Sequence, residues 1–478
     1  MNAMLYRTAR EMITDLAAKK VSARELLDAH VARKDALHAT LNAVVATDLD
    51  RARRDADAID KARMRGDALG PLAGIPMTIK DGYDVENMPA TSGNSAYANR
   101  DKTCVDADVV KSARTAGAIV WGKTNVPFML GDFQSYNDIY GTTNNPYDVT
   151  RTPGGSSGGA AASLASGITP LEIGSDIGGS LRHPANFCGV VSLKPTWGVL
   201  SSRGQIPPPP GLYSEADLGV VGPMARNTGD LRLLWNILRG RAGAAPRPVK
   251  GARVAVWDEE PGFPLSRNAK AGVARAADAL ANAGVEVERV RPPINGNELM
   301  DVYLSLLTPI IGQSLPTALV QSFEAQRSDD LVAMRNGVSP FSAVAYRLRV
   351  MASHREILAK MTRRQAMKDR LDAFFAEGWQ AILSPISIMP AFPHLQQPTF
   401  NERTLEVDGE TVPYATMLCW IALATTLHGP SLAVPAGQTA TGLPTGAQLM
   451  GPEHGEDRLF DFALAIEEQQ GGFRPPPI

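Results

Sequence analysis

The chain contains Thr152-Pro-Gly-Gly-Ser-Ser-Gly-Gly159 and, shortly after it, Gly174-Ser-Asp-Ile-Gly-Gly-Ser180. Both stretches set serines among glycines. Glycine loses more conformational freedom on folding than any other residue, so it is costly in regular structure. Two such stretches in close succession therefore predict backbone geometry that a larger residue could not adopt. They also predict backbone amides that can approach a reacting atom closely.

A lysine stands at the end of a short apolar segment upstream, in Gly74-Ile-Pro-Met-Thr-Ile-Lys-Asp81. The apolar run over 75–79 is bounded by Pro76 and Gly82, which predicts a buried strand that ends at Lys80. A lysine combined with serines, without an obligatory histidine, is a known arrangement for nucleophilic hydrolysis. The three segments together therefore predict a serine hydrolase with a lysine base.

Lys80 is the candidate general base. A lysine in water has a pKa of about 10.4 and is charged at neutral pH. It can accept a proton only if burial disfavours the ammonium form, and the apolar run before it supports burial. The neighbouring Asp81 would oppose this effect, but consecutive residues of a strand point to opposite faces. The alternative is a lysine held in a salt bridge at the end of a strand.

Ser180 is the candidate nucleophile, because the three residues before it can form an oxyanion hole. Ile177, Gly178 and Gly179 can turn their N–H groups toward one point, since two of them lack side chains. Loss of one such donor typically costs ~10²–10³ in rate. The alternative is a structural glycine turn between a strand and a helix. His183, three residues after Ser180, would also permit a Ser–His pair.

Further segments extend the pattern along the chain. They are Gly122-Lys-Thr-Asn125, Phe187-Cys-Gly-Val-Val-Ser-Leu-Lys-Pro195, Pro430-Ser-Leu-Ala-Val-Pro-Ala-Gly437 and Gly442-Leu-Pro-Thr-Gly-Ala-Gln-Leu-Met-Gly-Pro452. With the lysine and the two serine motifs, these segments resemble the amidase signature family in order and spacing. The resemblance covers nearly the whole chain and is weakest over about 292–364. One Gly-Gly-Ser-Ser-Gly-Gly segment alone would be a weak signal, since linkers contain it.

The resemblance implies a role for each residue of a Lys80, Ser156 and Ser180 triad. Ser156 would follow a cis peptide bond and lie between the lysine and the nucleophile. Lys80 would take a proton through Ser156 while Ser180 attacks the amide carbonyl, and water would then hydrolyse the acyl-enzyme. The residues implied to orient this arrangement are Ser157, Asp176 and Arg182.

The resemblance also implies an α/β fold, namely an α/β/α sandwich with a large twisted mixed sheet of about eleven strands flanked by helices. The chain would form a single amidase domain over 1–478. Its parts would be N-terminal helices over 1–70, the signature catalytic core over 71–235 and a variable, mostly helical, substrate-facing insert over 295–362. The alternative for the insert is a set of peripheral helices that only complete the core.

Periodicity and turn residues predict individual elements as well. Ser22-Ala-Arg-Glu25 is a capping box that begins a helix. The predicted strands are 41–45, 119–122, 253–257 and 285–290, and the predicted helices are 50–65, 107–116, 160–166 and 268–283. The strand, helix and strand between 253 and 290 form a βαβ-like unit that we expect to rejoin the same sheet.

The substrate is less determined by the sequence. The acyl pocket of the family would be lined here by Phe128, Met129, Leu130, Gly131 and Phe133. The apolar side chains of this segment would favour an apolar or aromatic substrate, but they could equally be core residues. We therefore expect a small-molecule substrate, either a small apolar or aryl amide or an aryl carbamate (urethane).

Two alternative functions remain open. One is the glutaminase subunit of a tRNA-dependent amidotransferase, although Val126-Pro127-Phe128 and Ala216-Asp-Leu-Gly219 resemble stand-alone amidases better. The other is a catalytically silent binding scaffold, which the presence of all three reactive side chains disfavours. Strict glutamine dependence would indicate the first, and absence of reaction with a fluorophosphonate would indicate the second.

Bulk composition excludes several other classes. The chain of 478 residues has a formal net charge of −2 and 44% hydrophobic residues, which predicts no nucleic-acid partner. No apolar run of 18 residues is present, so we expect no membrane-spanning helix. The three cysteines lack C-x-x-C spacing and the seven histidines lack metal-ligand spacing, so neither a disulfide framework nor a metal or other cofactor is expected. These features predict a cytoplasmic protein, and a homodimer is left open.

Overall fold

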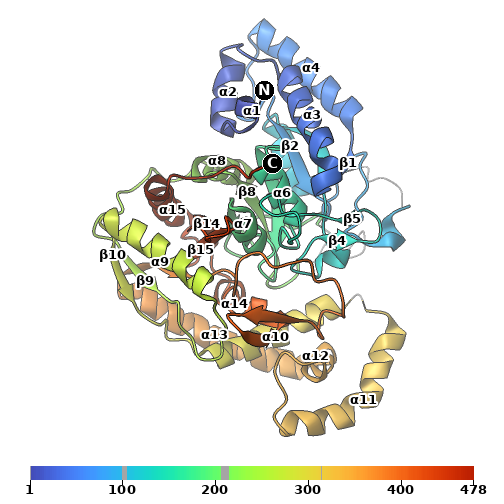
Figure 1. The fold of residues 1–478 in the computed structure, drawn as a ribbon, viewed down its shortest axis with the longest axis vertical. Coiled ribbons are helices and arrows are strands. Elements are labelled where there is room, and N and C mark those ends of the chain that lie inside the picture. The colour runs from blue at the N-terminus through green and yellow to red at the C-terminus, as the bar shows by residue number, and fades with distance from the viewer. Residues whose placement is uncertain (1, 100–104, 206–214, 314) are drawn as a thin grey trace.

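A mixed sheet of eleven strands forms the centre of the molecule (Figure 1). The computed structural model describes residues 2–99, 105–205, 215–313 and 315–478. The strands follow one another across the sheet in the order β1-β3-β2-β6-β8-β7-β14-β15-β11-β9-β10. They are β1 (Val44–Thr47), β2 (Pro76–Lys80), β3 (Ile119–Thr124), β6 (Leu171–Asp176), β7 (Val191–Lys194), β8 (Val220–Ala225), β9 (Arg253–Val256), β10 (Glu286–Arg289), β11 (Trp379–Ser384), β14 (Ser431–Gln438) and β15 (Pro444–Met450). The predicted α/β fold with about eleven strands is confirmed.

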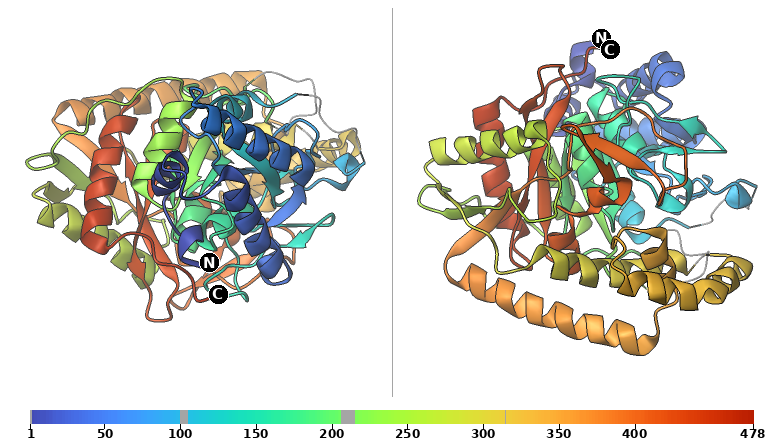
Figure 2. Two further views of the ribbon diagram at one scale, coloured as in Figure 1. Left: turned by 90° about the horizontal axis from the view of Figure 1, so that it is seen from above. Right: turned by 60° about the horizontal axis from the view of Figure 1, so that its bottom comes forward.

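Helices cover both faces of this sheet (Figures 1 and 2). They are α1 (Asn2–Leu5), α2 (Ala9–Ala17), α3 (Ala23–Leu41), α4 (Leu49–Arg65), α5 (Asp108–Thr115), α6 (Gly158–Ala165), α7 (Arg182–Cys188), α8 (Thr228–Leu238), α9 (Arg267–Asn282), α10 (Gly296–Gly312), α11 (Thr317–Arg335), α12 (Ala343–Val350), α13 (His354–Ala376), α14 (Ala422–Thr426) and α15 (Glu456–Gln470). Two small sheets pair β4 (Tyr136–Asn137) with β5 (Gly141–Thr142), and β12 (Thr404–Val407) with β13 (Glu410–Pro413). In the described part of the chain, no helix has both the length and the apolar character needed to cross a bilayer.

The sheet separates two hydrophobic cores, because successive residues of a strand point to opposite faces. On β11, Ala381 and Leu383 enter one core, and Ile382 enters the other. Helices α8, α9 and α15 contribute buried side chains to the first core, whereas α7, α10 and α13 contribute to the second. The result is a three-layer arrangement with helices on either side of the strands.

Capping residues explain where helix α3 begins and ends. Ser22 and Glu25 form the predicted capping box at the start of α3. This helix ends at Asn42, which adopts a left-handed conformation with φ of 47°. The predicted strand over 41–45 is therefore wrong at its start, because Leu41 is the last buried residue of α3 and the strand begins at Val44.

The predicted βαβ unit is confirmed as part of the large sheet. β9 and β10 are parallel and adjacent, and α9 connects them. β11 pairs in parallel with the other side of β9. The chain therefore leaves β9 in one direction across the sheet and returns past it through α10–α13 to reach β11.

Two strand ends position the catalytic candidates. β2 and β6 are neighbours and run parallel, so their carboxyl ends lie at the same edge of the sheet. Lys80 is the last residue of β2, and Asp176 is the last residue of β6. All five residues of β2 are buried, as its apolar run predicts. The fold thus brings the lysine motif and the second serine motif to one place.

Candidate active site

Lys80 contacts two serine hydroxyls at the edge of the sheet. Its Nζ lies 2.8 Å from Ser156 Oγ and 2.9 Å from Ser175 Oγ. The lysine side chain is fully buried, and Ser156 and Ser175 are 1% and 3% exposed. Ser175 belongs to the second serine motif, and the structure places its hydroxyl beside the amine. An amine flanked by two hydroxyls can accept a proton from one of them when it is neutral.

Burial lowers the pKa of Lys80 to about 7, while the negative charge of Asp176, and that of Glu172 when it is ionised, act in the opposite direction. The unfavourable desolvation of an ammonium group accounts for this direction. A lysine with a pKa in this range is neutral in a substantial fraction of molecules near pH 7. This electrostatic environment suits the role of general base.

Asp81 does not oppose the lowering of the Lys80 pKa, because its carboxylate is paired with other groups. It forms an ion pair with Lys123 at 3.2 Å and hydrogen bonds with Thr91. Lys123 also donates to the carbonyl oxygens of Tyr83 and Pro89. The alternation along the strand therefore separates Asp81 from Lys80, as the sequence predicts.

Glu172 is a buried carboxyl near the lysine that the sequence did not single out. It accepts hydrogen bonds from Thr78 Oγ1 at 2.7 Å and from the Ile173 N–H at 3.0 Å. Burial raises the pKa of Glu172 to about 8, although these hydrogen bonds oppose the rise. Glu172 is then mostly protonated at neutral pH, which keeps a negative charge away from Lys80.

The peptide bond between Gly155 and Ser156 is cis, as the resemblance implies. The surrounding backbone is tightly packed, which explains the glycines of this motif. A Cβ on Gly155 would lie 2.4 Å from the Asp132 carbonyl oxygen and 2.5 Å from the Gln134 nitrogen. A Cβ on Gly154, whose φ is +90°, would lie 2.7 Å from Pro184 Cα. Only glycine fits at these two positions.

Backbone contacts join the two serine motifs. The Ser157 N–H donates to the Ser180 carbonyl oxygen at 3.2 Å, and Ser157 Oγ lies 3.5 Å from the Ser175 carbonyl oxygen. Ser180 is 7% exposed. Ser157 therefore connects the segment that contains Ser156 to the segment that contains Ser180.

An ion pair fixes the turn that presents Ser180. Both carboxylate oxygens of Asp176 pair with the Arg182 guanidinium at 3.0 Å, and both side chains are fully buried. The same carboxylate accepts the N–H groups of Gly179 at 2.9 Å and Leu181 at 3.1 Å. Burial would raise the pKa of Asp176, but Arg182 and the Gly179 N–H hold it below its usual value. The carboxylate therefore stays ionised and ties down both sides of the turn.

These contacts change which amides can stabilise an oxyanion. The sequence proposed the N–H groups of Ile177, Gly178 and Gly179, but the Gly179 N–H already donates to Asp176. The oxyanion hole that we propose therefore rests on Ile177 and Gly178. Tyr303, from helix α10 of the insert, donates to the Ile177 carbonyl oxygen at 2.8 Å and thereby orients this peptide unit.

Arg182 links the turn to the rest of the protein. Its guanidinium donates to the Ile421 carbonyl oxygen, to Gln448 Oε1 and to Thr425 Oγ1 at 2.7–3.0 Å. Gln448 also donates to the Trp420 carbonyl oxygen at 2.8 Å. The turn before Ser180 is thus anchored to strand β15 and to the segment that contains α14.

His183 is not arranged as a base for Ser180. Its Nδ1 lies 2.7 Å from Ser387 Oγ, and its ring packs edge-on against Phe133 with centroids 5.3 Å apart. Burial lowers the pKa of His183 to about 3, so the ring is neutral at physiological pH. A Cβ on Gly179 would lie 2.4 Å from His183 Cδ2. The imidazole therefore packs under the turn.

The five proposed pocket residues differ in how deeply the structure buries them. Phe133 is buried near the turn, where it contacts His183, Phe400 and Tyr414. The Phe128 side chain is 59% exposed. In the same segment, Met129 and Leu130 are half-buried and Gly131 is exposed. Phe133 is therefore the member of this set best placed to meet a substrate.

The pH dependence of kcat/KM should report the protonation state of the Lys80 amine. Lys80 accepts a proton only when neutral, and its ammonium form grows as the pH falls through about 7. We therefore expect kcat/KM to rise with pH through this range and then level off. A profile measured from about pH 5.5 to 9 tests this, and a flat profile would exclude Lys80 as the base.

Glu172→Gln provides a variant for the same experiment. Glu172 is mostly protonated over the range in which Lys80 titrates, so replacing it with a neutral amide should leave the rising part of the profile near the same pH. A rise that moves to clearly lower pH in the variant would show that Glu172 is ionised beside Lys80.

Comparison with known proteins agrees with this geometry. A family model described as Amidase matches residues 25–460. The chain belongs to the amidase signature family. It is therefore a hydrolase that acts on carbon–nitrogen bonds. Among the described residues, no group of histidine, cysteine, aspartate and glutamate side chains is arranged to hold a metal ion.

Individual relatives cover the chain almost completely. It is 31% identical to a glutamyl-tRNA(Gln) amidotransferase subunit from Heliobacterium modesticaldum, over 97% of both proteins. The chain is also similar to a solved structure of a vestigial protein complex related to the origins of an s-triazine catabolic enzyme. The two are 27% identical with a TM-score of 0.80, and the match covers 98% of this chain and 100% of the other. A crystal structure of an amidase is 26% identical with a TM-score of 0.79, covering 97% and 100%.

Proposed function

We propose that this protein hydrolyses small apolar or aryl amides, aryl carbamates included, through an acyl-enzyme on Ser180. The observation that carries the proposal is the buried Lys80 amine, which lies 2.8 Å from Ser156 Oγ. The next residue, Ser157, donates its N–H to the Ser180 carbonyl oxygen and so joins the two serine motifs. Lys80 is the base, Ser156 passes the proton, and Ser180 attacks the carbonyl carbon.

The proposed proton path starts at the contact between Lys80 and Ser156 and continues to Ser180. The neutral Lys80 amine takes the proton of Ser156, which takes the proton of Ser180 as its oxygen attacks. The carbonyl oxygen becomes negative and is stabilised by the Ile177 and Gly178 N–H groups. The same path returns the proton to the leaving nitrogen, which departs as an amine. Water then attacks the acyl-enzyme by the same route and releases the acid.

Apolar side chains around the turn support the proposed substrate class. Leu418 Cδ2 lies 3.3 Å from the position of a Cβ on Gly178, and Ile421 Cγ2 lies 3.2 Å from that of Gly179. Phe133, which packs against Phe400 and Tyr414, also contacts His183 below the turn. These surfaces suit an apolar or aryl group next to the scissile carbonyl.

The charges of Arg403 and Asp132 are already paired with each other. Arg403 donates to Asp132 at 2.6 Å and to the Tyr136 hydroxyl at 2.8 Å, and Tyr414 donates to the same aspartate at 2.7 Å. Gln134 in turn donates to the Tyr414 hydroxyl at 3.1 Å. These groups satisfy one another and leave little unpaired charge to bind a charged substrate.

The second candidate function is the glutaminase subunit of a tRNA-dependent amidotransferase. It is favoured by the near-complete coverage of the curated relatives, which are such subunits. In that case the partners would be proteins of the amidotransferase complex, and the substrate would be glutamine. Glutamine carries an ammonium and a carboxylate, so its binding would require charged partners in the pocket.

Turnover of a matched substrate panel decides between the two functions. We expect the purified chain alone to hydrolyse an anilide or a phenyl carbamate at least 100-fold more efficiently than glutamine, as judged by kcat/KM. Glutamine hydrolysis that exceeds anilide hydrolysis, and that depends on a co-purified partner, would replace the proposal with the amidotransferase function.

We infer a cytoplasmic location, because Cys188 and Cys419 are buried free thiols. A small-molecule substrate without a nucleic-acid partner follows from the first candidate function. A homodimer remains open, and light scattering of the purified chain would determine it.

A further inference from the structure

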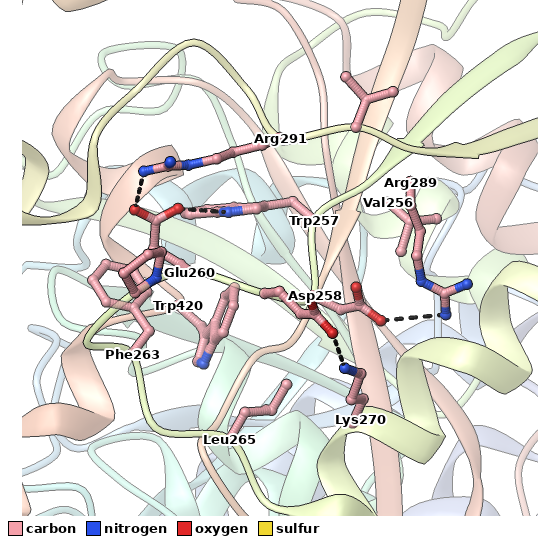
Figure 3. A pocket seen from close by; sticks show the side chains of 13 residues that line it. Val256, Trp257, Asp258, Glu260, Phe263, Leu265, Lys270, Arg289, Arg291 and Trp420 are labelled. Atoms are coloured by element: carbon pink, nitrogen blue, oxygen red, sulfur yellow. Dashed lines mark hydrogen bonds and ion pairs between the residues drawn. The ribbon is translucent and has the colours of Figure 1, made fainter.

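A cavity of about 700 Å³ lies beside the ends of β9 and β10 (Figure 3). Each basic side chain of its lining is paired with an acid of the same lining: Lys270 with Glu259, Arg289 with Asp258 and Arg291 with Glu260. Its tryptophans, Trp257 and Trp420, are 2% and 1% exposed. The groups of this cavity therefore satisfy one another and present a ligand with no unpaired basic side chain.

A buried serine outside the triad contacts the first serine motif instead. Ser135 Oγ donates to the Gly154 carbonyl oxygen at 3.1 Å and accepts the Gly158 N–H at 3.0 Å. The Ser156 carbonyl oxygen lies 3.5 Å from the same hydroxyl. Ser135 is 1% exposed, and its hydroxyl uses both its donor and an acceptor position on the motif. One side chain thus ties the backbone two residues before Ser156 to the backbone two residues after it.

Ser135 also caps the helix that follows the motif. Helix α6 begins at Gly158, and its N-cap residue Ser157 makes no capping hydrogen bond with its side chain. The first N–H groups of a helix lack partners within it, so an oxygen from elsewhere has to accept them. Ser135 accepts the Gly158 N–H from outside the helix. A Cβ on Gly158 would lie 2.4 Å from Ser135 Oγ, so the glycine leaves the space that this hydroxyl occupies.

The segment that carries Ser135 is fixed by other parts of the chain. Gln134 Nε2 donates to the Leu395 carbonyl oxygen at 2.5 Å, and Gln134 Oε1 accepts the Leu395 N–H at 2.8 Å. The Ser135 carbonyl oxygen accepts the Thr143 N–H at 2.9 Å. Ser135 is therefore a rigid support for the motif, because its own backbone is held on both sides.

The relay of the proposed mechanism requires such a support. Ser156 passes a proton to Lys80 only while its Oγ stays close to Nζ, and the two atoms lie 2.8 Å apart. A misplacement of about 1 Å in a reacting group can lower the rate by ~10²-fold. Loss of the Ser135 hydroxyl would release the backbone on both sides of Ser156 and so allow its Oγ to move away from the amine.

We propose that Ser135 is a positioning residue for the proton relay, which holds Ser156 against Lys80 through the backbone at Gly154 and Gly158. The proposal rests on the relay role that the proposed function gives to Ser156, but it does not depend on which amide is hydrolysed.

Steady-state kinetics of Ser135→Ala test the proposal on the full chain. We expect kcat for an anilide to fall by about 10–100-fold while KM stays within threefold of the parent value, because the relay is disturbed and the substrate pocket is not. A kcat within twofold of the parent value, or a loss that appears mainly in KM, would overturn the proposal.

Ser166→Ala is the matched control for a lost buried hydroxyl. Ser166 is fully buried, and its Oγ donates to the Ala162 carbonyl oxygen at 2.7 Å at the other end of α6. Both alanine variants should lower the melting temperature, but Ser166→Ala should keep kcat within twofold. An equal loss of kcat in both would show that the effect of Ser135→Ala is structural and would overturn the positioning role.

Two further variants keep the test decisive if Ser135→Ala folds poorly. Ser135→Thr and Ser135→Val add similar bulk and differ in the hydroxyl, so the threonine variant should have a kcat about tenfold higher. Equal kcat values in this pair would refute the proposal.

The rate at which a fluorophosphonate labels Ser180 separates this proposal from the substrate class. Labelling needs the relay but no amide substrate, so it should slow at least tenfold in Ser135→Ala even if the parent protein prefers glutamine to an anilide. Labelling at the parent rate would overturn the role of Ser135 and leave the proposed substrate class untouched.

Discussion

Replacing Ser180 with alanine should lower kcat for an anilide by at least roughly 10⁴-fold, in line with the loss of a nucleophile in other serine hydrolases. The variant removes the only oxygen that the proposed mechanism makes covalent with the substrate. The fold should persist, because the contact from the Ser157 N–H reaches the Ser180 backbone and not its hydroxyl. Stopped-flow or long-time turnover assays measure the residual rate, and the melting temperature reports the fold.

A matched serine variant controls for this experiment. Ser163 is buried in α6, and its hydroxyl has no hydrogen-bond partner among the described residues. Ser163→Ala makes the same chemical change and should keep turnover within a few-fold of the parent protein. If Ser180→Ala retained more than about a hundredth of the parent rate, another group would have to be the nucleophile.

Replacing Lys80 with methionine should lower kcat/KM by about 10²–10⁴-fold, the usual contribution of a general base. Methionine keeps much of the apolar stem in a site where the lysine is fully buried. It removes the amine that contacts Ser156 and Ser175, so Ser156 loses the acceptor for its proton. The rising limb of the pH profile should disappear together with the activity.

Lys194→Met is the matched control for the lysine variant. Burial lowers the pKa of Lys194 to about 7 as well, but its Nζ donates to the carbonyl oxygens of Pro195 and Gly429. Its removal should lower the melting temperature, because two buried carbonyl groups lose a donor. Turnover and the pH limb should remain. A loss in Lys194→Met as large as that in Lys80→Met would show that the effect is structural.

The motifs were sufficient to predict the centre of the site. The buried run before Lys80 predicted a strand, and the structure has all of β2 buried. Alternation along that strand predicted that Asp81 would point away, and the structure pairs Asp81 with Lys123. These predictions succeed because side-chain direction in a strand depends only on local geometry.

Other features of the site depend on residues distant in sequence. Glu172 and Ser175 reach Lys80 only because β6 pairs with β2. Tyr303 contacts the Ile177 carbonyl oxygen from a helix of the insert, more than a hundred residues later in the chain. Neither contact has a local signal, since each arises from the packing of separate elements.

The amino-acid sequence by itself determined the family and the α/β class, and it proposed the reacting side chains, because each of them resides in a short motif with its own local geometry. Tertiary structure decided which amide of the Ser180 turn is already used, since Asp176 accepts the Gly179 N–H while its partner Arg182 is held by Thr425 and Gln448. It also brought the ends of β9 and β10 together with Trp420 at the far edge of the sheet, a meeting in space that no periodicity in the chain encodes.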